Sequence, residues 1–230
     1  MLPVTNSATK NRIPRSRAGM LKITEIFHSL QGEARDAGKP TVFIRLTGCP
    51  LRCVYCDSEY AFYGGEWMHF DDILVKVAGY GAAHVCVTGG EPLAQKRCHE
   101  LLVQLCEAGY RVSLETSGAI DVSRVDGRVS RVIDLKTPDS SEESRNLWEN
   151  LGHLTDCDQI KFVICSRRDY DWARQQLKKR KFAECSEVLF SPAWDRQNAT
   201  ELAEWILEDR LPVRLQLQLH KLLWGDIPGK

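Results

Sequence analysis

Cys49, Cys53 and Cys56 share one short segment, residues 48–58, and have the spacing C-x3-C-x2-C. One loop with this spacing can supply three thiolates to a cluster of four irons, and it leaves one iron without a protein ligand. A cluster bound by four cysteines has no open position and serves electron transfer, whereas an open iron can bind a small molecule. The spacing therefore predicts a 4Fe-4S cluster that takes part in chemistry.

A zinc site and a chance grouping of core cysteines are the alternatives to a cluster. A structural zinc site needs four ligands, and the usual second C-x2-C or close histidine pair is absent from the sequence. The other six cysteines are scattered singly, mostly in apolar stretches that favour buried free thiols: Cys86, Cys98, Cys106, Cys157, Cys165 and Cys185. Because Gly48 and Pro50 favour a loop on which ligands can converge, we favour the cluster.

Length and charge limit the class of protein. The chain has 230 residues, enough for one sizeable α/β domain, and its 31 basic residues balance 31 acidic ones. This balance gives no general attraction to nucleic acid or to an anionic membrane, so we expect a small-molecule substrate. The nine cysteines, with no apolar segment typical of secretion or of a membrane span, lead us to expect a cytoplasmic protein.

The two ends of the chain differ from its middle. Residues 1–20 contain Lys10, Arg12, Arg15 and Arg17 but no acidic residue, and we expect them to form a disordered basic tail. We expect one domain over residues 21–230. Proline and glycine within residues 224–230 suggest that this segment lies across a surface or a pocket mouth.

Short apolar or β-branched runs alternate with amphipathic ones after residue 20. Strands are predicted over residues 21–27, 41–46, 84–88, 111–115, 131–135, 159–164, 188–190 and 213–217. Helices are predicted over residues 71–79, 93–108, 168–181 and 200–208. This alternation favours parallel strands with right-handed crossovers, and the number of units falls short of a closed eight-fold barrel. The expected fold class is α/β, with an incomplete (β/α) barrel-like curved parallel sheet.

Chemically suggestive residues follow several of the predicted strands. The cysteine segment comes after Leu46, and the next strands end in residues 88–92, 115–118 and 134–138. Ligands of such sheets gather at the carboxyl ends of the strands, where the following loops converge. We therefore expect these segments to share one rim.

The cysteine segment beside a Gly-Gly-Glu turn resembles the radical S-adenosylmethionine (SAM) superfamily, over nearly everything after Met20. The resemblance implies that the open iron binds the amino and carboxylate groups of SAM, and that reduction splits the cofactor to a 5′-deoxyadenosyl radical. Relatives carry Ser-Pro-Lys where this chain has Asp-Leu-Lys over residues 134–136. The implied SAM contacts are Tyr55, Cys56, Asp57, Gly89, Gly90, Glu91, Asp134, Lys136 and Ser191.

More specific segments resemble the 7-carboxy-7-deazaguanine synthase family: residues 25–33, 56–58, 114–118 and 217–221. The resemblance implies a radical lyase whose substrate is 6-carboxy-5,6,7,8-tetrahydropterin. The implied reaction is a ring contraction with loss of ammonia, in which SAM is regenerated. The product, 7-carboxy-7-deazaguanine, feeds 7-deazapurine and queuosine biosynthesis and thus a tRNA modification pathway.

The chemistry of that substrate suits several side chains. Arg45 would pair with the pterin carboxylate, with an ordinary salt bridge at the rim as the alternative. The aminopyrimidinone edge needs acceptors and an amide donor, which Gln31, Glu33 and Glu115 would supply; a structural hydrogen bond is the alternative for Glu115. The substrate contacts implied by the resemblance are Leu30, Gln31, Gly32, Glu33, Arg45, Thr88, Glu115 and His220.

The resemblance also implies partners for the enzyme. It assigns the Ser58 hydroxyl to Mg2+, although a serine in a turn would by itself be read as a turn former. It implies a low-potential electron donor, flavodoxin or ferredoxin, and a homodimer. The nearest alternative function is a radical SAM activase that acts on a partner protein. An electron carrier is less favoured because it prefers four cysteines, and a zinc-stabilised binding module is less favoured because it does not need Arg45, Glu115 and His220 in one site.

Overall fold

The computed structural model describes residues 19–180, 182, 186–225, 227 and 229. The expected basic tail therefore lies outside the described residues, apart from Gly19 and Met20. Met20 is the first residue of strand β1, which therefore begins one residue earlier than predicted. Ile227 and Gly229 line a pocket, as the composition of the last segment suggested.

The described strands form one nine-stranded sheet with the order β3-β1-β2-β4-β5-β6-β7-β8-β9. Its strands are β1 (Met20–Leu30), β2 (Pro40–Leu46), β3 (Glu66–His69), β4 (His84–Gly89), β5 (Arg111–Thr116), β6 (Ser130–Leu135), β7 (Gln159–Ile164), β8 (Glu187–Pro192) and β9 (Arg214–Leu215). The pairs from β2 through β4 to β9 are parallel. The sheet is curved and unclosed, which confirms the predicted fold class.

The first hairpin departs from the predicted parallel pairing. Strand β1 pairs antiparallel with both β2 and β3. Only nine residues, 31–39, connect β1 to β2, and a parallel crossover needs a dozen or more. The short connection makes the antiparallel arrangement the accessible one.

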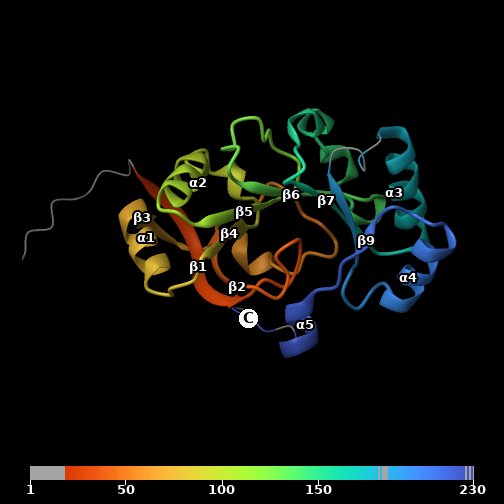
Figure 1. Ribbon diagram of the computed structural model, residues 1–230, viewed down its shortest axis with the longest axis horizontal. Coiled ribbons are helices and arrows are strands. Elements are labelled where there is room, and N and C mark those ends of the chain that lie inside the picture. Colours follow the sequence, from red (N-terminus) through yellow and green to blue (C-terminus); the bar gives the residue numbers. More distant parts are fainter. Residues whose placement is uncertain (1–18, 181, 183–185, 226, 228, 230) are drawn as a thin grey trace, which may run out of the picture.

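Helices cover the outside of the sheet in two groups (Figure 1). Helices α1 (Phe70–Ala78) and α2 (Cys98–Glu107) lie beside the half that contains β1 and β5, and α3 (Arg167–Arg180) and α4 (Ala199–Glu208) lie beside β7 and β9. Their apolar stripes complete one core with the strands, and Leu101, Leu102 and Leu105 of α2 are fully buried in it. Among the helices of the described residues, none has the length and apolar composition that a bilayer span requires.

Several element boundaries differ from the prediction. Helix α2 begins at Cys98, because Pro92 and the Glu91 cap form a separate 3-10 turn, η2 (Pro92–Ala94), before it. The predicted end of α3, Lys181, lies outside the described residues. Strand β9 has two residues rather than five, and the chain then forms α5 (Leu219–Trp224), which the periodicity did not indicate. The remaining 3-10 helices are η1 (Glu59–Ala61), η3 (Pro138–Ser140), η4 (Glu143–Arg145) and η5 (Trp148–His153).

A buried ion pair joins β6 to the start of β7 at the end of the sheet opposite the cysteine segment. The Arg131 and Asp158 side chains are 6% and 0% exposed. Asp158 Oδ1 accepts from the Arg131 backbone N–H at 2.8 Å and from Nε at 3.0 Å, and Oδ2 accepts from the Thr155 backbone N–H at 2.8 Å. Arg131 Nη2 also donates to Oδ2 at 2.5 Å, so each oxygen of this carboxylate accepts at least two hydrogen bonds from within the protein.

We expect Asp158→Asn to lower the free energy of unfolding by about 3–5 kcal/mol, because it leaves the Arg131 charge buried without a counter-ion. Urea unfolding measures the change. Asp126→Asn is the matched control, since Asp126 pairs with the exposed Arg128 and its loss should have little effect. Equal destabilisation by the two variants would contradict this account.

The effect should also depend on pH. Burial raises the pKa of Asp158, but the hydrogen bonds from Arg131 and Thr155 outweigh it and leave the pKa below its usual value. The stabilisation is therefore present above the unfolded carboxyl pKa of about 3.9 and is lost as the pH falls through the lowered folded value. The difference between wild type and Asp158→Asn should shrink over that acidic range, and a constant difference would contradict the assignment.

Candidate active site

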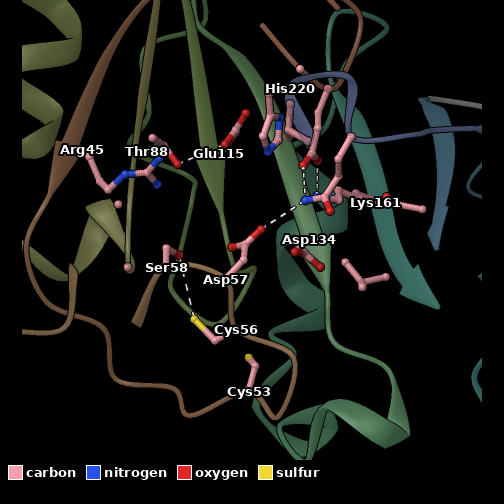
Figure 2. Close-up of a pocket in the computed structure, with 18 of the residues that line it drawn as sticks. Arg45, Cys53, Cys56, Asp57, Ser58, Thr88, Glu115, Asp134, Lys161 and His220 are labelled. Atoms are coloured by element: carbon pink, nitrogen blue, oxygen red, sulfur yellow. Dashed lines mark hydrogen bonds and ion pairs between the residues drawn. The ribbon is translucent and has the colours of Figure 1, made fainter. Parts of the chain in front are cut away.

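A cavity of about 380 Å³ lies at the carboxyl ends of the parallel strands, within the size range of small-molecule sites. In Figure 2 Cys53 and Cys56 lie at one end of this cavity and His220 at the other, with Asp57 between them. Every predicted site residue except Glu91 lines it: Leu30, Gln31, Gly32, Glu33, Arg45, Cys49, Cys53, Tyr55, Cys56, Asp57, Ser58, Thr88, Gly89, Gly90, Glu115, Asp134, Lys136, Ser191 and His220. The expectation that the strand-end segments share one rim is confirmed.

The cysteine segment follows β2 and is fixed by contacts with three distant parts of the chain. The Gly48 carbonyl accepts from the Glu91 backbone N–H at 2.8 Å. The Val54 backbone N–H donates to the Ser140 carbonyl at 3.1 Å, and the Val54 carbonyl accepts from Arg196 Nη2 at 2.8 Å. These bonds tie the loop to the segments after β4, β6 and β8.

The three thiols suit a multinuclear cluster better than a single ion. All three are half-buried free cysteines that line the cavity. In the part of the chain that the structure describes, no three His, Cys, Asp or Glu side chains are arranged around one metal position. Each thiolate of a 4Fe-4S cluster binds a different iron, so three thiols that line one cavity without surrounding one metal position are compatible with it.

Burial favours the protonated form of two of these thiols. It raises the pKa of Cys53 to about 11 and also raises the pKa of Cys49. Lys136 opposes this shift at both positions by favouring the thiolate. Cluster binding must therefore release protons from the cysteines.

The two glycines after β4 let the backbone pass close to the cysteine segment. A Cβ on Gly90 would lie 2.6 Å from both Cys49 Cβ and the Gly48 carbonyl oxygen, and one on Gly89 would lie 2.5 Å from the Leu46 carbonyl oxygen. These distances are too short for any side chain. The glycines therefore bring the strand end against the cysteine segment, in the place predicted for a cofactor.

Glu91 differs from the other predicted site residues, because its side chain faces the protein interior. It is fully buried and accepts hydrogen bonds from the Leu93 backbone N–H at 2.9 Å, Thr116 Oγ1 at 2.9 Å and the Ser117 backbone N–H at 2.7 Å. This carboxylate stabilises the loop rather than lining the cavity. Any contact of Glu91 with a ligand in the cavity would have to come from its backbone.

Unpaired polar atoms lie beside the cysteines. Tyr55 Oη and Asp134 Oδ1 are buried and have no hydrogen-bond partner among the described residues. The Lys136 Nζ lies 3.0 Å from Asp134 Oδ2 and 5.8 Å from the centre of the Tyr55 ring. Burial alone would lower the pKa of Lys136, but Asp134 outweighs it and raises that pKa. Orphaned buried atoms next to a fixed charge suit a polar, charged cofactor such as SAM.

A second polar network lies on β4 and β5, at the other side of the cavity. Glu115 accepts from Thr88 Oγ1 at 3.0 Å (Figure 2). It also accepts from Gln31 Nε2 at 3.3 Å. Both contacts connect residues that the sequence assigned to the substrate. The Gln31 and Thr88 side chains are nearly buried, so this network can present fixed donors and acceptors to a ligand edge.

Arg45 lies on β2 directly opposite Glu25 on β1. Its Nε donates to Glu25 Oε1 at 2.8 Å, and Tyr60 Oη donates to the same oxygen at 2.8 Å. The guanidinium lies 5.6 Å from the Tyr60 ring centre and 6.0 Å from that of Phe27. Arg45 thus forms a salt bridge with Glu25, as the alternative reading of this residue predicted. This salt bridge uses only Nε of the guanidinium, and Arg45 still lines the cavity.

Lys161 and Gln218 line the cavity but were missed by the sequence reading. Lys161 Nζ forms a close ion pair with Glu33 Oε2, and both side chains are only about 15% exposed. The sequence signal that could have indicated Lys161 is a lone lysine in the apolar strand over residues 159–164.

Gly32 must remain glycine, because a Cβ there would collide with Nδ1 of His220.

The other described cysteines lie outside the cavity lining. Cys86 and Cys98 are buried as predicted, whereas Cys106 and Cys165 are half-buried and Cys157 is exposed. Cys185 lies outside the described residues.

Ser58 Oγ, the predicted magnesium ligand, is 3.9 Å from Cys56 Sγ, and Ser58 lines the cavity.

The sequence pattern of the Radical SAM superfamily matches residues 43–136, the part that carries the cysteine segment and the glycine turn. The 7-carboxy-7-deazaguanine synthase of Koribacter versatilis is 42% identical over 219 residues, which cover 89% of this chain and 97% of that protein. The synthase of Chlorobaculum tepidum is 42% identical over 208 residues, with 89% and 94% covered.

Solved structures agree with the sequence matches. The crystal structure of QueE from Escherichia coli has a TM-score of 0.72 at 26% identity and covers 87% of this chain and 95% of its own. Streptococcus suis SuiB, at 14% identity and a TM-score of 0.53, shares the fold alone. The resemblance that the motifs indicated is confirmed: the chain belongs to the 7-carboxy-7-deazaguanine synthase family of the radical SAM superfamily.

Proposed function

We propose that this chain is a radical SAM lyase that converts 6-carboxy-5,6,7,8-tetrahydropterin to 7-carboxy-7-deazaguanine with loss of ammonia. One observation carries the proposal: in a member of this family, a single cavity joins the cysteine segment to Arg45, Gln31 and Glu115. The cavity is of the kind that takes small molecules, which favours the lyase over the activase of a partner protein. The product would enter 7-deazapurine and queuosine biosynthesis.

The cofactor half of the cavity is the end with the cysteines. Family membership implies a 4Fe-4S cluster and SAM, and we assign the cluster to Cys49, Cys53 and Cys56. When bound and reduced, these groups supply the 5′-deoxyadenosyl radical. We assign the SAM contacts to Tyr55, Cys56, Asp57, Gly89, Gly90, Asp134, Lys136 and Ser191, with Glu91 holding the glycine turn in place.

The substrate half is the end with the β4 and β5 network. Arg45 would bind the pterin carboxylate through the guanidinium N–H groups that Glu25 does not use. Gln31, Thr88 and Glu115 would fix the aminopyrimidinone edge, because they already order one another. Leu30, Gly32, Glu33 and His220 complete the wall.

Several finer parts of the proposal rest on the family resemblance. Ser58 would place a hydroxyl on Mg2+, which takes hard oxygen ligands and keeps water. The electron would come from a cytoplasmic flavodoxin or ferredoxin. A second subunit would cover the open side of the sheet to give a homodimer.

Incubation of the anaerobic, dithionite-reduced protein with the carboxypterin, SAM and Mg2+ tests the activity. We expect the ring-contracted product, measured by mass spectrometry. Formation of 5′-deoxyadenosine without that product would contradict the lyase and support the activase.

Replacement of Arg45 tests the substrate half. We expect Arg45→Ala to lower kcat/KM by a factor equivalent to about 2–4 kcal/mol, because it removes a charge-assisted bond to a carboxylate in a desolvated site. Steady-state kinetics measure the change. Arg111→Ala is the matched control, since Arg111 is an exposed residue at the opposite end of β5. An unchanged kcat/KM in Arg45→Ala would make Arg45 a structural partner of Glu25 only.

Removal of the Ser58 hydroxyl tests the magnesium site. We expect Ser58→Ala to raise the Mg2+ concentration needed for half-maximal activity, since a hard oxygen ligand is lost. Ser58→Thr keeps the hydroxyl and should retain the wild-type activation curve. Identical curves for all three proteins would exclude Ser58 from the metal shell.

A further inference from the structure

Gln218, the residue immediately before helix α5, joins two carboxylates that lie far apart in the sequence. Its Nε2 donates to Glu33 Oε1 at 2.9 Å and to Asp57 Oδ2 at 3.1 Å. A primary amide carries two N–H donors on this nitrogen, so both are used. The carboxylates belong to different loops, one between β1 and β2 and the other after the cysteines.

Each of these carboxylates also has a lysine partner. Lys161 pairs with Glu33, and Lys221 Nζ lies 3.5 Å from Asp57 Oδ2. Burial raises the pKa of Glu33, but Lys161 outweighs it and keeps that pKa below its usual value. The lysines therefore favour the charged carboxylates. The Gln218 amide joins one pair to the other by hydrogen bonds to both carboxylates.

The backbone around Gln218 is held independently of its side chain. The Leu219 N–H donates to the Gly32 carbonyl at 2.9 Å, and the Leu222 N–H donates to the Gln218 carbonyl at 3.2 Å. His220 packs against Gly32. A change of the Gln218 side chain should thus leave α5 in place.

We propose that Gln218 is a positioning residue that fixes the loop of Asp57 relative to the loop of Glu33. This inference rests on the proposed function, which places Asp57 beside SAM and Glu33 beside the pterin. In Figure 2 Asp57 lies between the cysteine end of the cavity and the end with Lys161 and His220. The amide thereby sets the separation of the cofactor half from the substrate half.

The role follows from what a radical reaction requires. The reactive carbon of the cofactor and the hydrogen atom of the substrate must be held in contact, and small misplacements are costly. With the tie lost, each carboxylate keeps its own lysine, but the Asp57 and Glu33 side chains are no longer held to each other. The substrate then binds less tightly, and more 5′-deoxyadenosine is released before it can be reconverted to SAM.

The test compares three substitutions in the holoenzyme with dithionite as reductant. Gln218→Met keeps the length but removes both donors, Gln218→Lys restores donors toward both carboxylates, and Gln218→Glu adds a third negative charge. We expect the Met variant to raise the substrate Kd on the order of tenfold, the factor that corresponds to 1.4 kcal/mol. The ratio of released 5′-deoxyadenosine to product should rise with it.

The Lys variant should stay close to wild type in both measurements, and the Glu variant should exceed the Met variant. Deuterium uptake over residues 31–36 should increase in the Met and Glu variants only, which gives a readout besides activity. Gln197→Met is the matched control, because Gln197 bonds only locally, to Glu201 and Asn198. It should change none of these quantities.

Equal effects of Met and Lys would overturn the proposal, because a donor would then not matter. A Met variant indistinguishable from wild type would overturn it as well. If Gln218→Met fails to fold, the comparison of Gln218→Glu with Gln218→Lys decides in the same way. Absence of product from the wild type would instead remove the proposed function, so the two failures are distinguishable.

Discussion

The buried residue Glu91 connects the loops that form the site. The Glu91 backbone N–H donates to the Gly48 carbonyl at 2.8 Å, at the start of the cysteine segment. Its side chain accepts from Thr116 and from the Ser117 backbone N–H, at the end of β5. Three loops from three strands thus meet at one residue, and the carboxylate is satisfied because all its partners come from the protein.

Charge in the cavity is organised in the same self-contained way. The cationic side chains Arg45, Lys136 and Lys161 each have a carboxylate partner, namely Glu25, Asp134 and Glu33. Such pairing stabilises ionised groups in a half-buried place before any ligand arrives. These ion pairs also fix the orientation of the charged side chains. A charged ligand is therefore oriented by them as well as attracted to them.

Local patterns were sufficient to predict which residues line the cavity. The cysteine spacing, the glycine turn and the strand-end residues each occupy a few consecutive positions, and the rule that parallel strands end at one rim brings them together. Glu91 was assigned to the cofactor because its motif is local, yet its hydrogen bonds to Thr116 and Ser117 turn the side chain inward. The sequence did not predict Lys161 and Gln218 as site residues. Both contact Glu33, which lies 128 residues from Lys161 and 185 residues from Gln218, and no local sequence pattern spans such separations.

The account depends on a 4Fe-4S cluster with one iron left open for SAM. Electron paramagnetic resonance of the anaerobic, reduced protein tests this most directly, with and without SAM. We predict a 4Fe-4S signal that changes when SAM is added, because the cofactor binds the open iron. A signal that saturating SAM leaves unchanged, or full activity in protein that contains no iron, would contradict the account.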